Sequence, residues 1–208
     1  HKTPVMAPEN AQQKQAKEFR FTLKKGAETG NLLHDILENI DFSHANWSLA
    51  SQIPLTKFTV LNDAEQDDLF AWLAECLLTP LNDGLRLADL GLSQTLREAE
   101  FYFPMASVNI QNLGKVLTRY RLSRAQQFCS KAVSVNMQNI PELQGMMHGF
   151  IDLIFEHQGK YFVADYKSTH LGNELEAYSF LACHENNQQH LYDLQYLLYS
   201  LALHKYLK

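Results

Sequence analysis

Apolar and polar positions recur with a helical period in several parts of the chain. Residues 29–40, TGNLLHDILENI, predict a helix with Thr29 as a candidate N-cap. The apolar stripe of this helix consists of Leu33, Ile36, Leu37 and Ile40. Residues 63–80 predict a second helix, which a proline closes, and residues 190–208 predict a third. Residues 112–128 are ambiguous, with a partly helical pattern.

Three other segments alternate with the period of two that is typical of strands. They are TLREAEFYFPM at 95–105, with Pro104 expected to end the strand, LQGMMHGFIDLIFE at 143–156 and KYFVADYKST at 160–169. Helices come first in this order, then three strands, then a helix. This order predicts an α+β fold with a mixed sheet.

The last two strands are predicted to form a hairpin with Gln158 and Gly159 at its tip, because glycine readily takes the positive φ that such turns need. A turn there pairs Asp152 with Asp165, with Cβ atoms roughly 4.5–5.5 Å apart, an arrangement that is ordinarily destabilising for like charges. Alternation then places Asp165 and Lys167 on one face of the strand and Tyr166 on the other.

Two interpretations of these charges remain open. An Asp-x-Lys pattern on a strand is often a surface ion pair. Alternatively, the two carboxylates bind a hard divalent cation such as Mg²⁺, which prefers oxygen ligands. The apolar surroundings and the cross-strand pairing favour the cation, because an ion pair accounts for one aspartate and leaves the other unexplained.

Composition limits the possible functions. The chain has 208 residues, 46% of them hydrophobic and 20% charged, which suits one globular domain with an appendage or two small domains. The net charge of −5 argues against binding of nucleic acid through a large basic surface. Residues 1–20 are polar and predict a linker or arm.

Several classes of protein are disfavoured by missing motifs. No apolar run is long enough for a membrane span or a signal peptide, so an intracellular protein is expected. Cys76, Cys129 and Cys183 suggest neither a disulfide framework nor a zinc site, which fits a reducing compartment. The absence of a glycine-rich phosphate loop argues against chemistry driven by ATP within this chain.

The motif GFID at 149–152, followed by ADYK at 164–167, resembles the core of the PD-(D/E)xK nucleases. In detail, the chain from about Phe19 to Lys208 resembles the C-terminal nuclease domain of RecB, a subunit of bacterial RecBCD (exodeoxyribonuclease V). The segments GNLLHDILENIDF, EAEFYFP, GFIDLIFEHQGKYFVADYKS and YDLQYLLYSLALHKYL occur in that family's order. The resemblance implies a restriction-endonuclease-like α/β/α core with a mixed central sheet, flanking helices and an N-terminal helical part, within residues 21–208.

The resemblance also assigns metal ligands. His34 falls on the histidine of a G-x-x-x-H motif, although from its helical position alone a solvent-facing histidine was the simpler interpretation. His34, Asp152, Asp165 and the main-chain carbonyl of Tyr166 are then expected to hold Mg²⁺, with Mn²⁺ as a substitute and Ca²⁺ as an inhibitor. Asp152, Asp165 and Lys167 are the expected catalytic residues, and Lys167 would orient or deprotonate a water molecule or stabilise the transition state.

Three further residues receive roles from the resemblance. Glu100 is a secondary candidate for positioning metal or water, against the alternative of an exposed strand face. Gln195 and Tyr199 lie four apart on one helical face and match the Q-x-x-x-Y motif, which implies DNA positioning. Without the resemblance, tyrosine at this spacing is usually core packing.

The implied function is a Mg²⁺-dependent DNA nuclease of a helicase–nuclease complex that repairs double-strand breaks in the bacterial cytoplasm. DNA, RecC, RecD and RecA are the implied partners, and no membrane is expected. One alternative is a non-catalytic docking module for partner subunits or RecA, and another is a stand-alone phage-type exonuclease. The helicase part of the family is absent from this sequence, and a strand that follows the Q-x-x-x-Y helix in the family is missing.

Overall fold

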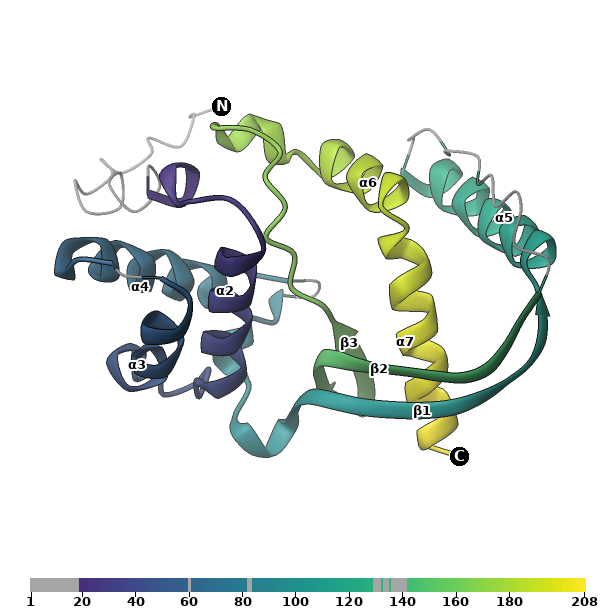
Figure 1. Ribbon diagram of the computed structural model, residues 1–208, viewed down its shortest axis with the longest axis horizontal. Helices are drawn as coiled ribbons and strands as arrows, with labels where there is room; N and C mark the ends of the chain where they lie inside the picture. Colours follow the sequence, from purple (N-terminus) through teal and green to yellow (C-terminus); the bar gives the residue numbers. More distant parts are fainter. Residues whose placement is uncertain (1–18, 60, 82–83, 129–131, 133–134, 136–141) are drawn as a thin grey trace, which may run out of the picture. The chain divides into compact units, whose positions relative to one another are not determined.

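The computed structural model describes residues 19–59, 61–81, 84–128, 132, 135 and 142–208 (Figure 1). They form two compact units, each built from two pieces of sequence. The first unit comprises His1–Thr95 and Lys167–Asn173, and the second comprises Leu96–Tyr166 and Glu174–Lys208. The arm predicted at residues 1–20 lies outside the described residues, except for its last two residues, which belong to a helical turn over 19–22. None of the described helices is long and apolar enough to cross a membrane.

The first unit is helical. Its long helices are α2 (Ala27–Asn39), α3 (Trp47–Phe58) and α4 (Asp63–Leu78), and two 3-10 turns follow at Leu87–Asp89 and Leu92–Gln94. Figure 1 shows these three helices at the purple and blue end of the colour scale. α2 packs against α3.

The predicted stripe of α2 is confirmed, because all four of its apolar residues are buried together with Leu32. The prediction of Thr29 as the N-cap is wrong. The helix begins two residues earlier, after Gly26, so the Thr29 hydroxyl lies inside it and donates to the main-chain carbonyl of Lys24 at 2.5 Å.

α4 confirms the second predicted helix and shows why it starts where it does. Asn62 accepts a hydrogen bond from the Glu65 main-chain N–H at 3.0 Å, and the Glu65 carboxylate accepts one from the Asn62 N–H at 2.9 Å. This reciprocal pair satisfies two of the N–H groups that a helix leaves open at its first turn. α3 was not predicted, and its weak pattern explains this: Leu49 and Ile53 are exposed, whereas Ser51 and Pro54 are buried.

The second unit contains a three-stranded sheet in the order β1 (Thr95–Asn109), β2 (Glu142–His157) and β3 (Lys160–Ala164). Strands β2 and β3 are antiparallel, with Leu153 opposite Ala164 and His157 opposite Lys160. This is the predicted register. Gln158 and Gly159 form the turn with φ of 52° and 74°, and two positive φ values in succession are typical of the type I′ hairpin turn.

β3 is shorter than predicted, because it ends at Ala164 instead of continuing to residue 169. The main-chain N–H of Tyr166 donates to a carboxylate oxygen of Asp152 at 2.7 Å. The Asp152 side chain therefore accepts from a main-chain N–H group that would pair with β2 if β3 were longer. The alternation expected for Asp165, Tyr166 and Lys167 does not apply, because these residues lie beyond the strand.

β1 is longer than predicted and continues through Pro104 to Asn109, so the expectation that Pro104 ends the strand is wrong. β1 lies at an edge of the described sheet. Proline lacks a main-chain N–H, and an edge strand tolerates it because one side of that strand pairs with no neighbour.

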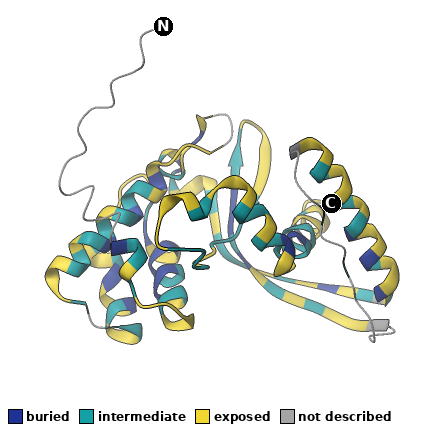
Figure 2. Ribbon diagram, turned by 90° about the horizontal axis from the view of Figure 1, so that it is seen from above, coloured by how far each residue is buried: buried dark blue, intermediate teal, exposed yellow. Residues whose placement is uncertain are grey.

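Helices α5 (Ile110–Phe128), α6 (Phe180–Gln189) and α7 (Tyr192–Tyr206) complete the second unit, with a 3-10 turn at Leu175–Tyr178. α7 crosses β1 and β2 (Figure 1), and its Ala202 shares a core cluster with Phe103, Ile151 and Ile154. Figure 2 colours the strands by burial; residues 151 and 153–155 of β2 are buried, whereas most described residues of β1 are half-buried or exposed. Helices together with an antiparallel strand pair confirm the predicted α+β class, and α5 and α7 confirm the predicted helical segments. α6 was not predicted.

Candidate active site

Asp152 lies in β2 among buried apolar residues. Ile151 and Ile154 belong to one core cluster of the second unit, and Leu153 and Phe155 are buried as well. Asp152 is half-buried, and its hydrogen bond from the Tyr166 N–H holds the first residues after β3 beside its carboxylate.

Glu98 is the glutamate that approaches this carboxylate. Carboxylate oxygens of Glu98 and Asp152 lie within 4.8 Å of one another, and both residues are half-buried. Glu98 has φ of 46°, in the left-handed region that non-glycine residues seldom adopt. This backbone conformation breaks the alternation of β1. Sequence reasoning missed Glu98, since no pattern in the chain signals a positive φ at a glutamate.

Glu100, the predicted secondary candidate, lies elsewhere. Its side chain is exposed, and its carboxylate accepts a hydrogen bond from the Tyr102 hydroxyl at 2.7 Å and lies 3.0 Å from the His148 ring nitrogen Nε2. These contacts from Tyr102 and His148 lower the pKa of Glu100 below its ordinary value. The Tyr102 and His148 rings also stack, with centroids 4.2 Å apart. The structure thus groups Glu100 with two exposed rings.

Asp165 is held from α7. The side-chain amide of Gln195 donates to a carboxylate oxygen of Asp165 at 2.9 Å and to the hydroxyl of Tyr199 at 2.7 Å. Burial raises the pKa of Tyr199 above its ordinary value, the hydrogen bond from Gln195 lowers it, and the charges of Asp165 and Asp152 raise it further. Tyr199 therefore stays protonated at neutral pH, as a hydroxyl close to both aspartates. The structure thus brings together Asp165, Gln195 and Tyr199.

The chain passes from the second unit to the first between Tyr166 and Lys167. Burial, as the main cause, raises the pKa of the Tyr166 phenol, and the charge of nearby Arg97 lowers it. Lys167 is exposed and lies in an irregular segment. The predicted catalytic run therefore consists of two half-buried residues, Asp165 and Tyr166, followed by the exposed Lys167.

His34 lies on α2 in the first unit and is half-buried. One turn before it, Gly30 packs so closely against the chain that an added Cβ atom would lie 3.1 Å from the hydroxyl oxygen of Ser168. Ser168 directly follows Lys167. The absence of a side chain at Gly30 thus lets α2 approach the segment that carries the predicted catalytic lysine.

The chemistry of the Glu98 and Asp152 pair suits a divalent cation. Two carboxylates this close repel each other unless a positive charge compensates them. Carboxylate oxygens are also the ligands that Mg²⁺ and Mn²⁺ prefer. The residues present therefore fit such a cation.

Comparison with known proteins gives one family. The family model of the PD-(D/E)XK nuclease superfamily matches residues 10–208. The chain is 35% identical over 188 residues to the "RecBCD enzyme subunit RecB" of Escherichia coli (strain K12), covering 88% of this chain and 15% of that protein. The corresponding subunit of Haemophilus influenzae is 32% identical over 191 residues, with 89% and 15% covered. That of Mycobacterium tuberculosis is 29% identical over 209 residues, with 89% and 19% covered. The chain therefore spans less than a fifth of the length of these relatives.

Proposed function

Because the chain belongs to the PD-(D/E)XK nuclease superfamily, we propose that it hydrolyses phosphodiester bonds of DNA in a reaction that depends on Mg²⁺ or Mn²⁺. The observation that carries the proposal is the half-buried pair of carboxylates from Glu98 and Asp152, within 4.8 Å of one another. The hydrogen bond from the Tyr166 N–H to Asp152 supports it, because it brings the motif's two halves together.

The proposed ligands are Asp152, Asp165, the main-chain carbonyl of Tyr166 and His34, with Glu98 as an addition from the geometry. The support for His34 is the close packing of Gly30 against Ser168 in the same unit. A bound divalent cation would stabilise charge on the scissile phosphate and lower the pKa of the attacking water.

The protein's own groups have separate proposed roles. Gln195 fixes the orientation of the Asp165 carboxylate through one of its two amide N–H groups. The protonated Tyr199 hydroxyl can donate to an anionic oxygen nearby. Lys167 is exposed and long, so its ammonium group can reach a phosphate and stabilise the negative charge that builds up on it.

We further propose that the chain works in a helicase–nuclease complex that processes DNA double-strand breaks in the bacterial cytoplasm. The support is the name of its relatives, each a RecBCD enzyme subunit. Partner subunits equivalent to RecC and RecD would deliver the DNA strand, and RecA is a further proposed partner. Local delivery would compensate for the net charge of −5, which disfavours DNA binding by bulk attraction.

The test is digestion of linear and circular single-stranded DNA in the presence of Mg²⁺, Mn²⁺, Ca²⁺ or a chelator. Cleavage is expected with Mg²⁺ and Mn²⁺ only. Asp165→Asn should lower the cleavage rate by at least about a hundredfold, because removal of one group that stabilises the charge of a transition state typically has an effect of that size. Glu185→Gln is the matched control, because it removes an exposed carboxylate from α6. Equal rates for both variants would contradict the assignment and favour the docking alternative.

A further inference from the structure

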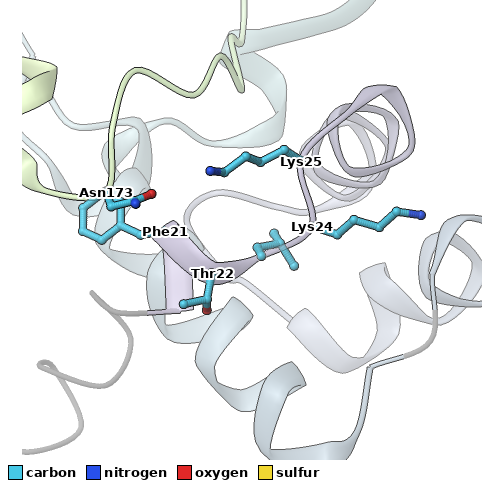
Figure 3. A pocket seen from close by; sticks show the side chains of 6 residues that line it. Phe21, Thr22, Lys24, Lys25 and Asn173 are labelled. Carbon is cyan, nitrogen blue, oxygen red and sulfur yellow. The ribbon is translucent and has the colours of Figure 1, made fainter.

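A hollow of about 590 Å³ opens on the first unit, lined by residues 21–25 and by Asn173. Figure 3 shows Phe21 and Asn173 next to each other at one end of it. Its volume lies within the range of about 300–1,000 Å³ that is usual for ligand sites. The hollow is therefore large enough for one nucleotide.

The side chains of Lys24 and Lys25 extend in different directions, and Lys24 forms an ion pair with Glu28. The ammonium group of Lys24 donates to a carboxylate oxygen of Glu28 at 2.8 Å, and Figure 3 shows its side chain extending away. The Lys25 side chain extends over the hollow toward Phe21 and Asn173 (Figure 3). The six described residues that line the hollow include no carboxylate. Lys25 therefore gives the hollow a local positive charge, on a chain whose net charge is −5.

The end of the hollow opposite the Lys25 backbone has a different chemistry. Phe21 is half-buried and presents an aromatic ring, while the exposed Asn173 amide offers both donors and an acceptor. The cation suits the phosphate of a nucleotide, the aromatic ring suits the face of its base, and the amide suits the edge of the base. Proteins that bind single strands combine aromatic stacking of bases with positive charge for the backbone.

The hollow lies close, along the chain, to the proposed catalytic lysine. Asn173 is six residues after Lys167, and both belong to the first unit. Six residues span at most about 20 Å. A nucleotide in the hollow would therefore lie no more than a few nucleotides from a phosphate at Lys167.

We propose that this hollow holds one nucleotide of a single-stranded DNA substrate. The base lies against the Phe21 ring, the phosphate contacts the Lys25 ammonium group, and Asn173 forms hydrogen bonds with the edge of the base. Bases in a duplex remain stacked on their neighbours and cannot lie on Phe21, so the hollow selects single strands. This inference rests on the proposed nuclease function and specifies its substrate.

The test measures binding of the full chain to fluorescein-labelled oligodeoxythymidylate by anisotropy, in chelator so that no cleavage occurs, at several salt concentrations. Lys25→Gln should weaken binding about fivefold to tenfold and reduce the slope of log affinity against log salt by about 0.7, the value for one phosphate contact on a single strand. Lys115→Gln is the matched control. It changes the net charge equally but alters an exposed lysine of α5 that does not line the hollow, so a smaller loss and an unchanged slope are expected.

Phe21→Leu keeps an apolar side chain but removes the ring. It should weaken binding of the single strand by on the order of tenfold, with little effect on a duplex of the same length. Equal losses for Lys25→Gln and Lys115→Gln, or equal effects of Phe21→Leu on both kinds of DNA, would overturn the inference. Mg²⁺-dependent cleavage by the unaltered chain would in that case still support the nuclease function. Loss of that cleavage with a selective Lys25 effect would remove the nuclease function and leave the DNA site supported.

Discussion

Glu98 combines two unfavourable features in one residue. Its backbone has φ of 46°, which costs about 1–2 kcal/mol for a residue with a Cβ atom. Its carboxylate also lies within 4.8 Å of another carboxylate, that of Asp152. Strain of this kind occurs most often at functional sites, where the surrounding structure imposes it. A cation between the two carboxylates would offset both costs.

Replacement of Glu98 by Gln is predicted to weaken Mn²⁺ binding by at least tenfold, because a unit charge about 4 Å from an ion contributes several kcal/mol at an effective dielectric constant of about 20. Titration calorimetry measures the affinity. Glu100→Gln is the control, since Glu100 is exposed and lies beside Tyr102 and His148 instead. A larger loss with Glu100→Gln than with Glu98→Gln would reverse the assignment.

The buried phenol of Tyr166 leads to a prediction about alkaline pH. Burial raises its pKa above the ordinary value of about 10, so the folded chain holds this proton more tightly than the unfolded chain does. The stability contribution is therefore constant below about pH 10 and is lost as the pH rises above it, by up to about 1.4 kcal/mol per pH unit for one group. Tyr166→Phe should reduce this slope in urea unfolding between pH 9.5 and 11.5, a range of about two units around the unfolded pKa.

Tyr161→Phe is the control for that measurement, because Tyr161 is 55% exposed. Loss of this hydroxyl, which already contacts water in the folded chain, should change the slope less than Tyr166→Phe does. Tyr196 and Tyr199 also have raised pKa values, so Tyr166→Phe should flatten the dependence only in part. An unchanged slope in Tyr166→Phe would show that the phenol is hydrated in the folded chain.

At the residue scale, the sequence predicted the register of the hairpin from its Gln158–Gly159 turn. That register determines which residues of β2 and β3 lie opposite each other, and it places Asp152 and Asp165 on the two sides of the hairpin. Gln195 was singled out by the resemblance to the Q-x-x-x-Y motif and not by helical spacing alone, and its role in positioning DNA stays a prediction. Glu98 was not found. Its position depends on a positive φ that arises from tertiary packing, and the residue type does not reveal it.

Among the helices and strands, the junction of α6 and α7 is held by α5. The guanidinium of Arg121 donates to both carboxylate oxygens of Asp193, at 2.5 and 2.8 Å, and to the main-chain carbonyl of Gln188 at 2.7 Å. Arg121 is only 2% exposed. Next to this pair, the hydroxyls of Tyr120 and Tyr196 lie 2.9 Å apart. These contacts fix the first turn of α7, two residues before Gln195.

Arg121→Ala is predicted to lower the free energy of unfolding by about 3–5 kcal/mol, because it leaves the buried carboxylate of Asp193 without its counter-ion. Urea unfolding followed by circular dichroism gives the value. The control Arg119→Ala alters an exposed arginine on the same helix and should change stability by less than about 0.5 kcal/mol. A loss below 1 kcal/mol in Arg121→Ala would mean, on the usual scale of exposed pairs, that water reaches the carboxylate.

The elements that the sequence predicted well are those with a clear period, such as α2 and the β2–β3 hairpin. α6 was missed because FLACHENNQQ is mostly polar and buries only Gln188 in the described structure. The length of β1 was underestimated because a proline is compatible with an edge strand, and the sequence does not reveal which strand is at the edge. The presence of α6 and the length of β1 therefore depend on tertiary packing, which the local sequence pattern does not reveal.

On the scale of the whole molecule, the two units are interleaved in sequence. The first unit takes Lys167–Asn173 from within the sequence of the second. Ser168 of this short segment lies against Gly30 of α2, where an added Cβ would be 3.1 Å from its hydroxyl. The segment is therefore part of the first unit's packing.

A fragment of residues 1–95 is accordingly predicted to be less stable than the same fragment joined to residues 167–173 through a flexible glycine-serine linker. A difference of several degrees in midpoint is expected, since about 1 kcal/mol shifts the midpoint of a domain this size by about 4–8 °C. Thermal unfolding followed by circular dichroism at 222 nm, a standard helical band, gives the comparison. Equal midpoints would show that the segment adds nothing to the helices.

The interleaving also constrains how genes of this family can recombine. A crossover at the Thr95–Leu96 boundary would unite the helices from one parent with the segment Lys167–Asn173 from the other. The residue that packs against Gly30, which is Ser168 here, would then come from the other parent. A bulkier residue at that position would clash with α2. Chimeras that fold should therefore take positions 30 and 168 from the same parent protein.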